Sequence, residues 1–465
     1  MSHPPSLTAA AVDDPCVALG HTQHCFDALE RLTAQHPGDS WVRSPQGDRQ
    51  LVLRSLDLIR TVLIRDYKSY GKGRTFANMK LLMGDGLIVQ EGDVWRRQRY
   101  MMQPMFHDDV LGRTSAVIRR HALGLGERWE HAARRGTPVD LVRDVSRAVL
   151  DTLLESIFGD DLARVGRGTD DPFGFLVDDA RELSLVPRFR RAMAGVDEVV
   201  QQRLRYDRLP PDLLSMLIAA RDRSGEPMTV PRIRDEVATL LIAGHETTAS
   251  MLAWTWYELA AHPEIHAQLR RDADDAGLGR ASSPAIPRLP YADEILLEVL
   301  RLYPPVWLED RVALEDVELG PWSIPRGTEL FIPIYFVHRD PRHFPQPHRF
   351  WPERFEDHPL DPRYAADIRG PDAPRASFGA GGTTSAFMPF SLGPRRCIGD
   401  RLVILTGRLH LGLLAPRLSL HREGAAELTK APRVNLRPTE GVHMRAVVRG
   451  ADDPGPAGRS QEQCA

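Results

Sequence analysis

The feature that most constrains the fold is a long helical pattern from Thr229 to about Ala261, TVPRIRDEVATLLIAGHETTASMLAWTWYELAA. Thr229 is a plausible N-cap, Pro231 lies in the first turn, where proline is tolerated, and Pro263 predicts that the helix ends after His262. About 30 residues at 1.5 Å each make a rod of roughly 45 Å. Because the middle of the segment is apolar on nearly all sides, we expect this helix to cross the protein interior.

A second helix and several short strands follow. The pattern YADEILLEVLRLY predicts a helix over 291–303, stopped by Pro304 and Pro305. The pieces VALEDVELG and TELFIPIYFV then indicate strands, separated by a turn at Ser323–Gly327. The fold class we expect is therefore mainly α with small β-sheets (α+β).

The domain organisation predicted for the 465 residues is a single domain over 21–449. Residues 1–20 and 450–465 have the composition of flexible tails, and 360–386 is typical of an extended surface loop. No internal repeat is visible. The formal net charge of −3, from 60 basic and 63 acidic side chains, favours neither nucleic acid nor an anionic membrane surface as partner.

The four cysteines give no disulfide framework. Cys16 and Cys25 lie near the N-terminus and Cys464 is next to last, so Cys397 stands alone in the body of the chain. This pattern fits a reducing compartment. The first thirty residues lack a signal-peptide pattern, and no apolar run approaches the roughly 20 residues that span a bilayer. We expect a cytoplasmic protein without a membrane anchor.

The segment FSLGPRRCIG, residues 390–399, contains the pattern F-x-x-G-x-R-x-C-x-G. Five fixed positions occur by chance in a chain of this length on the order of once in ten thousand. An isolated cysteine is most often a buried, inert side chain. This segment, however, resembles the haem-binding signature of the cytochrome P450 family. The resemblance extends over roughly residues 25–447 and implies the cytochrome P450 fold.

The resemblance implies haem b as cofactor, with its iron held by the thiolate of Cys397. A thiolate ligand pushes electron density toward oxygen and favours O–O cleavage. Phe390 would shield the sulfur from water, and Arg395 would pair with a haem propionate. Gly393 and Gly399 would let the backbone pass close to the porphyrin.

Three further residues match the family's propionate partners. Trp95 and Arg99, in WRRQR, are one helical turn apart, and Arg311 lies in the first strand after the 291–303 helix. Outside this family, an Arg and a Trp at that spacing would form a stacked surface pair.

The long helix contains AGHETT, residues 243–248, which resembles the family's A-G-x-[D/E]-T-[T/S]. The resemblance implies that Ala243 and Gly244 leave room for dioxygen and haem. Glu246 and Thr247 would then be catalytic and steer protons during oxygen activation. The alternative for Thr247 is a hydroxyl that hydrogen-bonds within its own helix.

Glu298 and Arg301 form E-x-x-R, and Arg354 follows in PERF. Alone, a pair three residues apart is usually a solvated contact worth a few tenths of a kcal/mol. The family resemblance instead implies a buried ion network beneath the haem loop, with a structural role. One departure from the family lies after the cysteine, where Val403 and Thr406 replace its usual Ala and Glu.

The activity implied is that of a monooxygenase acting with O2 on a hydrophobic small molecule: a terpenoid, a fatty acid or another secondary metabolite. Electrons would come from a separate ferredoxin and ferredoxin reductase, or from a flavodoxin-type donor, with Arg96, Arg97, Arg396 and Arg401 as a basic docking face. By family position, residues 71–90, Leu240–Ala243, Val306–Leu308 and Val434–Leu436 would line the pocket, with Trp307, Phe76 and Met79 as its bulkier members. We expect a monomer.

Two alternatives stay open. One is a haem-thiolate peroxygenase or isomerase, which often lacks the acid–threonine pair. The other is a non-catalytic haem sensor, which needs no proton relay. Product formation that depends on NAD(P)H and O2 separates the three.

Overall fold

The computed structural model describes residues 11–12, 22–44, 46–165, 173–179, 186–278, 288–356, 386–423, 428–439 and 441–450. The predicted tails therefore lie outside the described residues, apart from 11–12 and residue 450. The predicted surface loop at 360–386 also lies outside them, except for its last residue.

The helices of the described residues are α1 (Gln23–Gln35), α2 (Leu56–Arg60), α3 (Thr75–Met83), α4 (Gly92–Met102), α5 (Asp108–Arg135), α6 (Leu141–Phe158), α7 (Leu162–Val165), α8 (Phe175–Asp179), α9 (Val186–Arg203), α10 (Leu213–Ala219), α11 (Val230–Ala261), α12 (Pro263–Asp275), α13 (Pro290–Leu302), α14 (Ile334–Val337) and α16 (Asp400–Leu414). The strands are β1 (Ala11–Val12), β2 (Ser40–Arg43), β3 (Arg49–Val52), β4 (Tyr70–Lys72), β5 (Val139–Asp140), β6 (Glu309–Ala313), β7 (Val317–Leu319), β8 (Trp322–Ile324), β9 (Glu329–Ile332), β10 (Leu418–Arg422), β11 (Lys430–Pro432), β12 (Leu436–Pro438) and β13 (His443–Val448).

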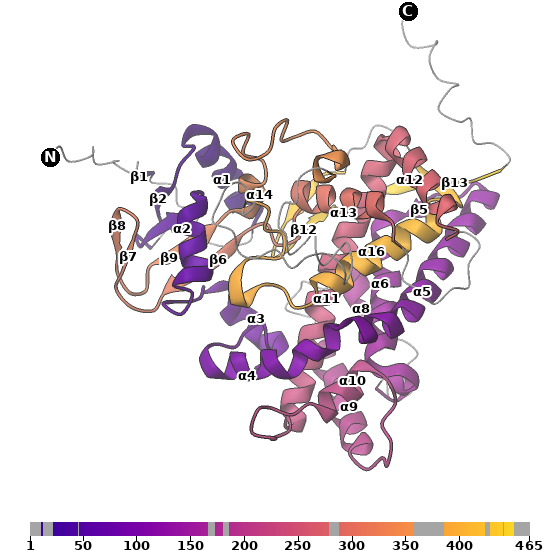
Figure 1. The fold of residues 1–465 in the computed structure, drawn as a ribbon, viewed down its shortest axis with the longest axis horizontal. Coiled ribbons are helices and arrows are strands. Elements are labelled where there is room, and N and C mark those ends of the chain that lie inside the picture. The colour runs from indigo at the N-terminus through magenta and orange to yellow at the C-terminus, as the bar shows by residue number, and fades with distance from the viewer. Residues whose placement is uncertain are drawn as a thin grey trace, which may run out of the picture.

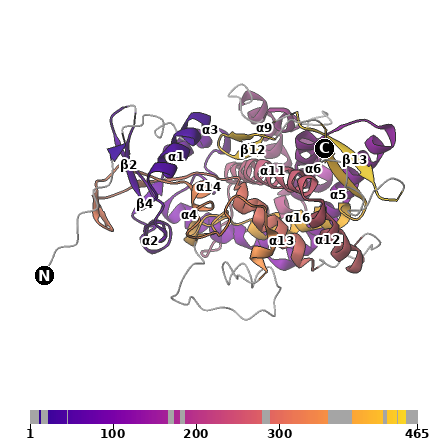
Figure 2. The same ribbon diagram turned by 90° about the horizontal axis from the view of Figure 1, so that it is seen from above.

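One sheet has the strand order β1-β2-β3-β9-β6-β4 and lies at one end of the molecule beside α1 and α2 (Figure 1). Its β4–β6 pairing is antiparallel and places Lys72 opposite Arg311. Antiparallel β11 and β12 form a separate hairpin. The long helices gather at the other end, with α11 running through their middle (Figure 2). The expected mainly helical fold with small sheets is confirmed.

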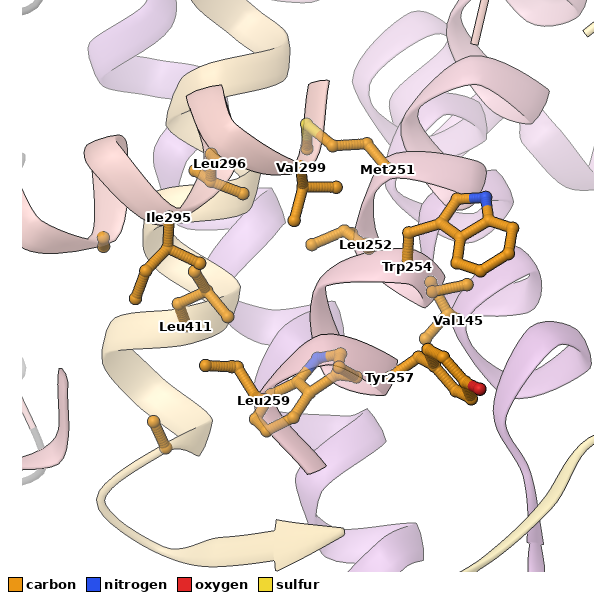
Figure 3. Close-up of a cluster of buried hydrophobic side chains, with 14 of the residues drawn as sticks. Val145, Met251, Leu252, Trp254, Tyr257, Leu259, Ile295, Leu296, Val299 and Leu411 are labelled. Carbon is orange, nitrogen blue, oxygen red and sulfur yellow. The ribbon is translucent and has the colours of Figure 1, made fainter. Parts of the chain in front are cut away.

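The largest buried cluster joins α6, α11, α13 and α16 (Figure 3). Met251, Leu252 and Trp254 of α11 pack with Val299 of α13 in this cluster, and each is at most 1 % exposed. Since α11 buries residues around its whole circumference between 248 and 259, the predicted interior helix is confirmed.

The predicted helix boundaries hold to within a residue. α11 begins at Val230 after Thr229, although the side chain of Thr229 makes no capping hydrogen bond. α13 ends at Leu302, before Pro304. Two predictions were wrong. IYFV forms the helical turn α14 and does not continue the strand, because Pro333 ends β9 and cannot donate to a sheet ladder. The turn expected at Ser323–Gly327 starts later, because Trp322–Ile324 forms β8, which pairs with β7. No helix of the described residues has the length and apolar character needed to span a membrane.

Candidate functional site

A cavity of about 1270 Å³ lies between α3, the middle of α11, β6 and the 389–403 segment. It is larger than the roughly 300–1,000 Å³ of common ligand pockets, so it has room for a prosthetic group together with a small molecule. Its walls are mainly apolar, with Phe76, Met79, Leu240 and Val306 among them. Trp307 does not line it. That side chain is fully buried behind the wall, where it packs on Phe26.

The Cys397 side chain opens into this cavity. Its backbone N–H donates to the carbonyl oxygen of Phe390 at 2.9 Å, which closes the loop. Gly393 has φ 71°, and a Cβ there would overlap the carbonyl oxygen of Leu63, so both the turn and the close approach require glycine. Gly399 is the N-cap of α16. The loop geometry therefore aims one sulfur at the cavity.

Burial, followed by the charge of Asp400, raises the pKa of the Cys397 thiol to about 11. The positive charges of Arg99 and Arg396 act in the opposite direction. Thiolate is the form that binds metal, so metal binding here would release the thiol proton. The side chain of Arg99 also donates to the carbonyl oxygen of Arg396, which ties α4 to the cysteine loop.

Cations crowd another part of the cavity wall. Arg311 and Lys72 face each other across β4 and β6, and both line the cavity with Arg395. Arg395 lies over the ring of Trp95 at 5.0 Å and binds Glu91, while Arg311 binds Glu309. Burial and the neighbouring Arg395 lower the pKa of Lys72 to about 7. An anionic group bound here would stabilise these cations. Lys72 falls within residues 71–90, which were expected to line the pocket, but its place opposite Arg311 follows only from the strand pairing.

In α11, Ala243, Gly244, Glu246 and Thr247 all line the cavity. The Thr247 hydroxyl donates to the carbonyl oxygen of Ala243 at 2.6 Å, the helix-internal bond considered above. This bond uses the hydroxyl hydrogen and leaves the oxygen as an acceptor on the cavity wall. The two interpretations of Thr247 are therefore compatible.

Glu246 binds Asn435, which falls in the expected lining stretch Val434–Leu436, and Arg437, which was not predicted. Asn435 Nδ2 donates to one carboxylate oxygen at 2.9 Å, and Arg437 Nη1 lies 3.3 Å from the other. Burial raises the pKa of Glu246, while the Asn435 hydrogen bond and the charge of Arg433 lower it. Both partners belong to the β11–β12 hairpin, so no sequence spacing could have indicated them.

The E-x-x-R pair and Arg354 come together in one buried network, as the family resemblance implied. Arg301 binds both oxygens of Glu298 at 2.7 and 2.8 Å, and Arg354 Nε lies 3.1 Å from the same carboxylate. All three side chains are at most 5 % exposed. The carbonyl oxygen of His338 accepts from Arg301 at 2.9 Å.

His338 links this network to the cysteine loop and was not predicted. Its Nε2 accepts from the backbone N–H of Met388 at 2.9 Å, and its Nδ1 lies 3.3 Å from the carbonyl oxygen of Arg301. Burial, and next the charge of Arg301, hold the pKa of His338 well below its usual range, so the ring is neutral. A neutral ring with its proton on Nδ1 fits both contacts.

The family model described as Cytochrome P450 matches residues 16–183 and 175–441. Cyclooctatin synthase of Streptomyces melanosporofaciens is 30% identical over 82% of this chain and 82% of its own length. Cyclooctat-9-en-7-ol 5-monooxygenase of the same organism is 30% identical over 86% of this chain and 87% of its own. Human cytochrome P450 4F8 is 28% identical over 84% of this chain and 79% of its own length. The crystal structure of the cytochrome P450DA heme domain matches with a TM-score of 0.79 at 24% identity, covering 95% of this chain and 97% of that one, which shows a shared fold.

Proposed function

Since the chain belongs to the cytochrome P450 family of haem monooxygenases, we propose that it inserts one oxygen atom of O2 into a hydrophobic small molecule of the terpenoid or fatty-acid type, by hydroxylation or epoxidation. The observation that carries this proposal is the Cys397 thiol opening into a mainly apolar cavity that Thr247 also lines. The Cys397 thiol and the Thr247 hydroxyl therefore line the same cavity, whose mainly apolar walls suit an apolar substrate.

The residues present fit haem b. The cavity volume exceeds that of a single small-molecule site, and Arg395 Nε is buried without a hydrogen-bond partner among the described residues. A propionate oxygen would supply the missing acceptor. We assign iron ligation to Cys397, and propionate binding to the donors on the cavity wall: Lys72, Trp95, Arg99, Arg311 and Arg395. When bound, thiolate-ligated haem supplies the oxygen activation.

Proton handling is assigned to Glu246 and Thr247. The Thr247 oxygen can accept a hydrogen bond from water or substrate in the cavity while its hydroxyl group donates to the carbonyl oxygen of Ala243. Glu246, the adjacent residue of α11, can take up and release a proton. Ala243 and Gly244 present little side-chain volume to the cavity beside them.

The substrate class rests on the apolar cavity lining and on the relatives. One Streptomyces relative is by name a monooxygenase of cyclooctat-9-en-7-ol, and a human relative that is 26% identical is an ultra-long-chain fatty acid omega-hydroxylase. Both names specify hydrophobic molecules. Aromatic and thioether side chains such as Phe76 and Met79 suit such a ligand.

We propose a separate ferredoxin or flavodoxin-type carrier as electron donor. The four arginines expected to form a basic docking face each bind an acidic side chain of the chain itself, which weakens that expectation. These pairs are Arg96–Asp93, Arg97–Asp222, Arg396–Asp400 and Arg401–Asp108.

The test uses the purified haem-loaded enzyme. We expect one haem b per chain and, in the reduced CO complex, the red-shifted Soret band of thiolate ligation. Terpenoids and fatty acids that shift the haem spin state should be oxidised with NAD(P)H, O2 and a ferredoxin system. A Soret band typical of histidine ligation would contradict the role of Cys397. Product from peroxide alone would favour a peroxygenase, and binding without any product would favour a sensor.

A further inference from the structure

Three hydrogen bonds anchor the β11–β12 hairpin to α11 and to the segment that follows α13. Ser250, one turn after Glu246 in α11, donates to the carbonyl oxygen of Leu436 at 2.8 Å. The backbone N–H of Leu436 donates to the carbonyl oxygen of Pro305 at 2.7 Å. Trp307 Nε1 donates to the carbonyl oxygen of Arg433 at 2.7 Å. These bonds fix the hairpin against α11 and against the segment that follows α13.

Anchoring at Leu436 sets the direction of its two neighbours. Asn435 immediately precedes β12 and Arg437 lies within it, on either side of the anchored Leu436, and both side chains project toward α11. Asn435 and Arg437 therefore both reach the Glu246 carboxylate, where each binds a different oxygen. Both are at most 9 % exposed, so water does not readily replace them.

Charge explains why a carboxylate at this place needs such partners. Burial disfavours an ionised carboxyl group unless hydrogen bonds or opposite charges compensate. The charged groups placed against Glu246 include Arg433 and Arg437, both on the hairpin, and Asn435 adds a neutral donor. Without them, the buried group would hold its proton more tightly and turn more freely.

We propose that Asn435 and Arg437 are positioning residues, which hold the Glu246 carboxylate in one orientation on the cavity wall beside Thr247. A fixed carboxylate takes up and releases a proton at one place, whereas a free one would sample several rotamers. The role rests on the proposed monooxygenase function. It assigns to the hairpin a task in proton handling, in addition to its place in the cavity wall.

The experiment is an infrared pH titration of the resting haem-loaded enzyme. The carbonyl band of protonated Glu246 is assigned by its loss in Glu246→Gln, and its midpoint is compared between variants. We expect Arg437→Gln and Asn435→Ala to raise the midpoint by about 1 pH unit or more, because stabilisation of the charged form is lost. Arg437→Lys keeps the charge and should restore most of the shift.

A matched control is Arg449→Gln. Arg449 forms an ion pair with Asp274 at 2.6 Å, but both side chains are more than a third exposed and neither lines the cavity. This variant should leave the midpoint unchanged. Circular dichroism and haem content check the fold of every variant.

An unchanged midpoint in both Arg437→Gln and Asn435→Ala would overturn the proposal. Loss of folding in all three hairpin variants would overturn it too, because the contacts would then be purely structural. The ratio of product to NAD(P)H consumed should fall several-fold in Arg437→Gln and recover in Arg437→Lys. If the midpoint shifts but no substrate is ever oxidised, the proposed function fails, and what stands is only that Asn435 and Arg437 stabilise the charged form of Glu246. If oxidation occurs and the midpoint does not shift, the positioning role alone fails.

Discussion

Two buried carboxylates of this chain bind arginine in different surroundings. Glu298 is fully buried and accepts two hydrogen bonds from Arg301, at 2.7 and 2.8 Å, and a third from Arg354 at 3.1 Å. Glu246 lines the cavity, and its arginine, Arg437, lies at 3.3 Å. The Glu298 network is closed on all sides, whereas Glu246 has one side on the space where a ligand would lie.

The difference shows that the role of a buried ion pair depends on whether molecules in the cavity can reach it. A sealed pair cannot exchange protons with a substrate. Removing one partner leaves an uncompensated buried charge, so such a mutation mainly lowers the stability of the fold. A carboxylate on a cavity wall can exchange protons with cavity water, so its effect falls on chemistry. The predictions below test this contrast.

The largest effect is expected at the sealed network. Glu298→Ala or Arg301→Ala strands the remaining partners and should cost about 3–5 kcal/mol of stability. We expect little haem-loaded protein, measured as haem absorbance per mole of purified chain. Normal expression and haem content in both variants would mean that the pair contributes little to stability.

On the cavity wall, Thr247→Ala should keep the fold, the haem and substrate binding but lose efficiency. Lost general-acid assistance typically costs about 10²–10⁴-fold, reduced where water substitutes. The readout is product formed per NAD(P)H consumed, with hydrogen peroxide measured alongside.

Thr255→Ala is the matched control, since Thr255 makes the same helix-internal bond, to Met251 at 2.7 Å, but is fully buried away from the cavity. Equal efficiency in wild type and Thr247→Ala would remove Thr247 from the mechanism.

Lowering the pH should change the stability contributed by His338, beside the sealed network, and by Glu246, on the cavity wall, in opposite directions. His338 is neutral when folded and binds a proton near pH 6.5 when unfolded, so its contribution is present above that pH and is lost below it, by about 1.4 kcal/mol per pH unit. Glu246 has a raised pKa, so the folded state holds that proton more tightly and stability rises as pH falls through this raised value.

The measurement is the thermal unfolding midpoint of wild type, His338→Asn and Glu246→Gln at several pH values. On acidification, the advantage of wild type over His338→Asn should shrink. The unfolding midpoint of wild type minus that of Glu246→Gln should increase as the pH falls. Parallel curves for all three proteins would show that neither group is perturbed by folding.

The smallest effect is expected at an exposed pair. Arg449 lies 2.6 Å from Asp274, as close as the pairs in the sealed network, yet it is 48 % exposed. Surface pairs are typically worth about 0.2–1 kcal/mol. Arg449→Gln should therefore shift the unfolding midpoint little. A loss as large as that of Glu298→Ala would contradict access as the deciding variable.

Local patterns predicted much of this fold. Pro231 and Pro263 define the ends of α11 to within a residue, because proline restricts the backbone at its own position. The apolar middle of the segment indicates that the helix is buried. The cysteine loop was recognisable because its glycines meet a local requirement, such as φ 71° at Gly393. The error at IYFV was also local in origin. Its β-branched and aromatic residues favour a strand, but Pro333 ends β9 because it cannot donate to a sheet ladder.

The partners of the candidate site depended on contacts between distant segments. Glu246 and Arg437 are 191 residues apart, and His338 meets Met388 across 50. No periodicity or motif spacing encodes such pairs, because they arise only when α11, the hairpin and the cysteine loop pack around one cavity. The amino-acid sequence thus determined which groups can do chemistry, since motif and helix signals are local. The tertiary structure decided which of them touch, since burial and ion pairing depend on what folding brings together.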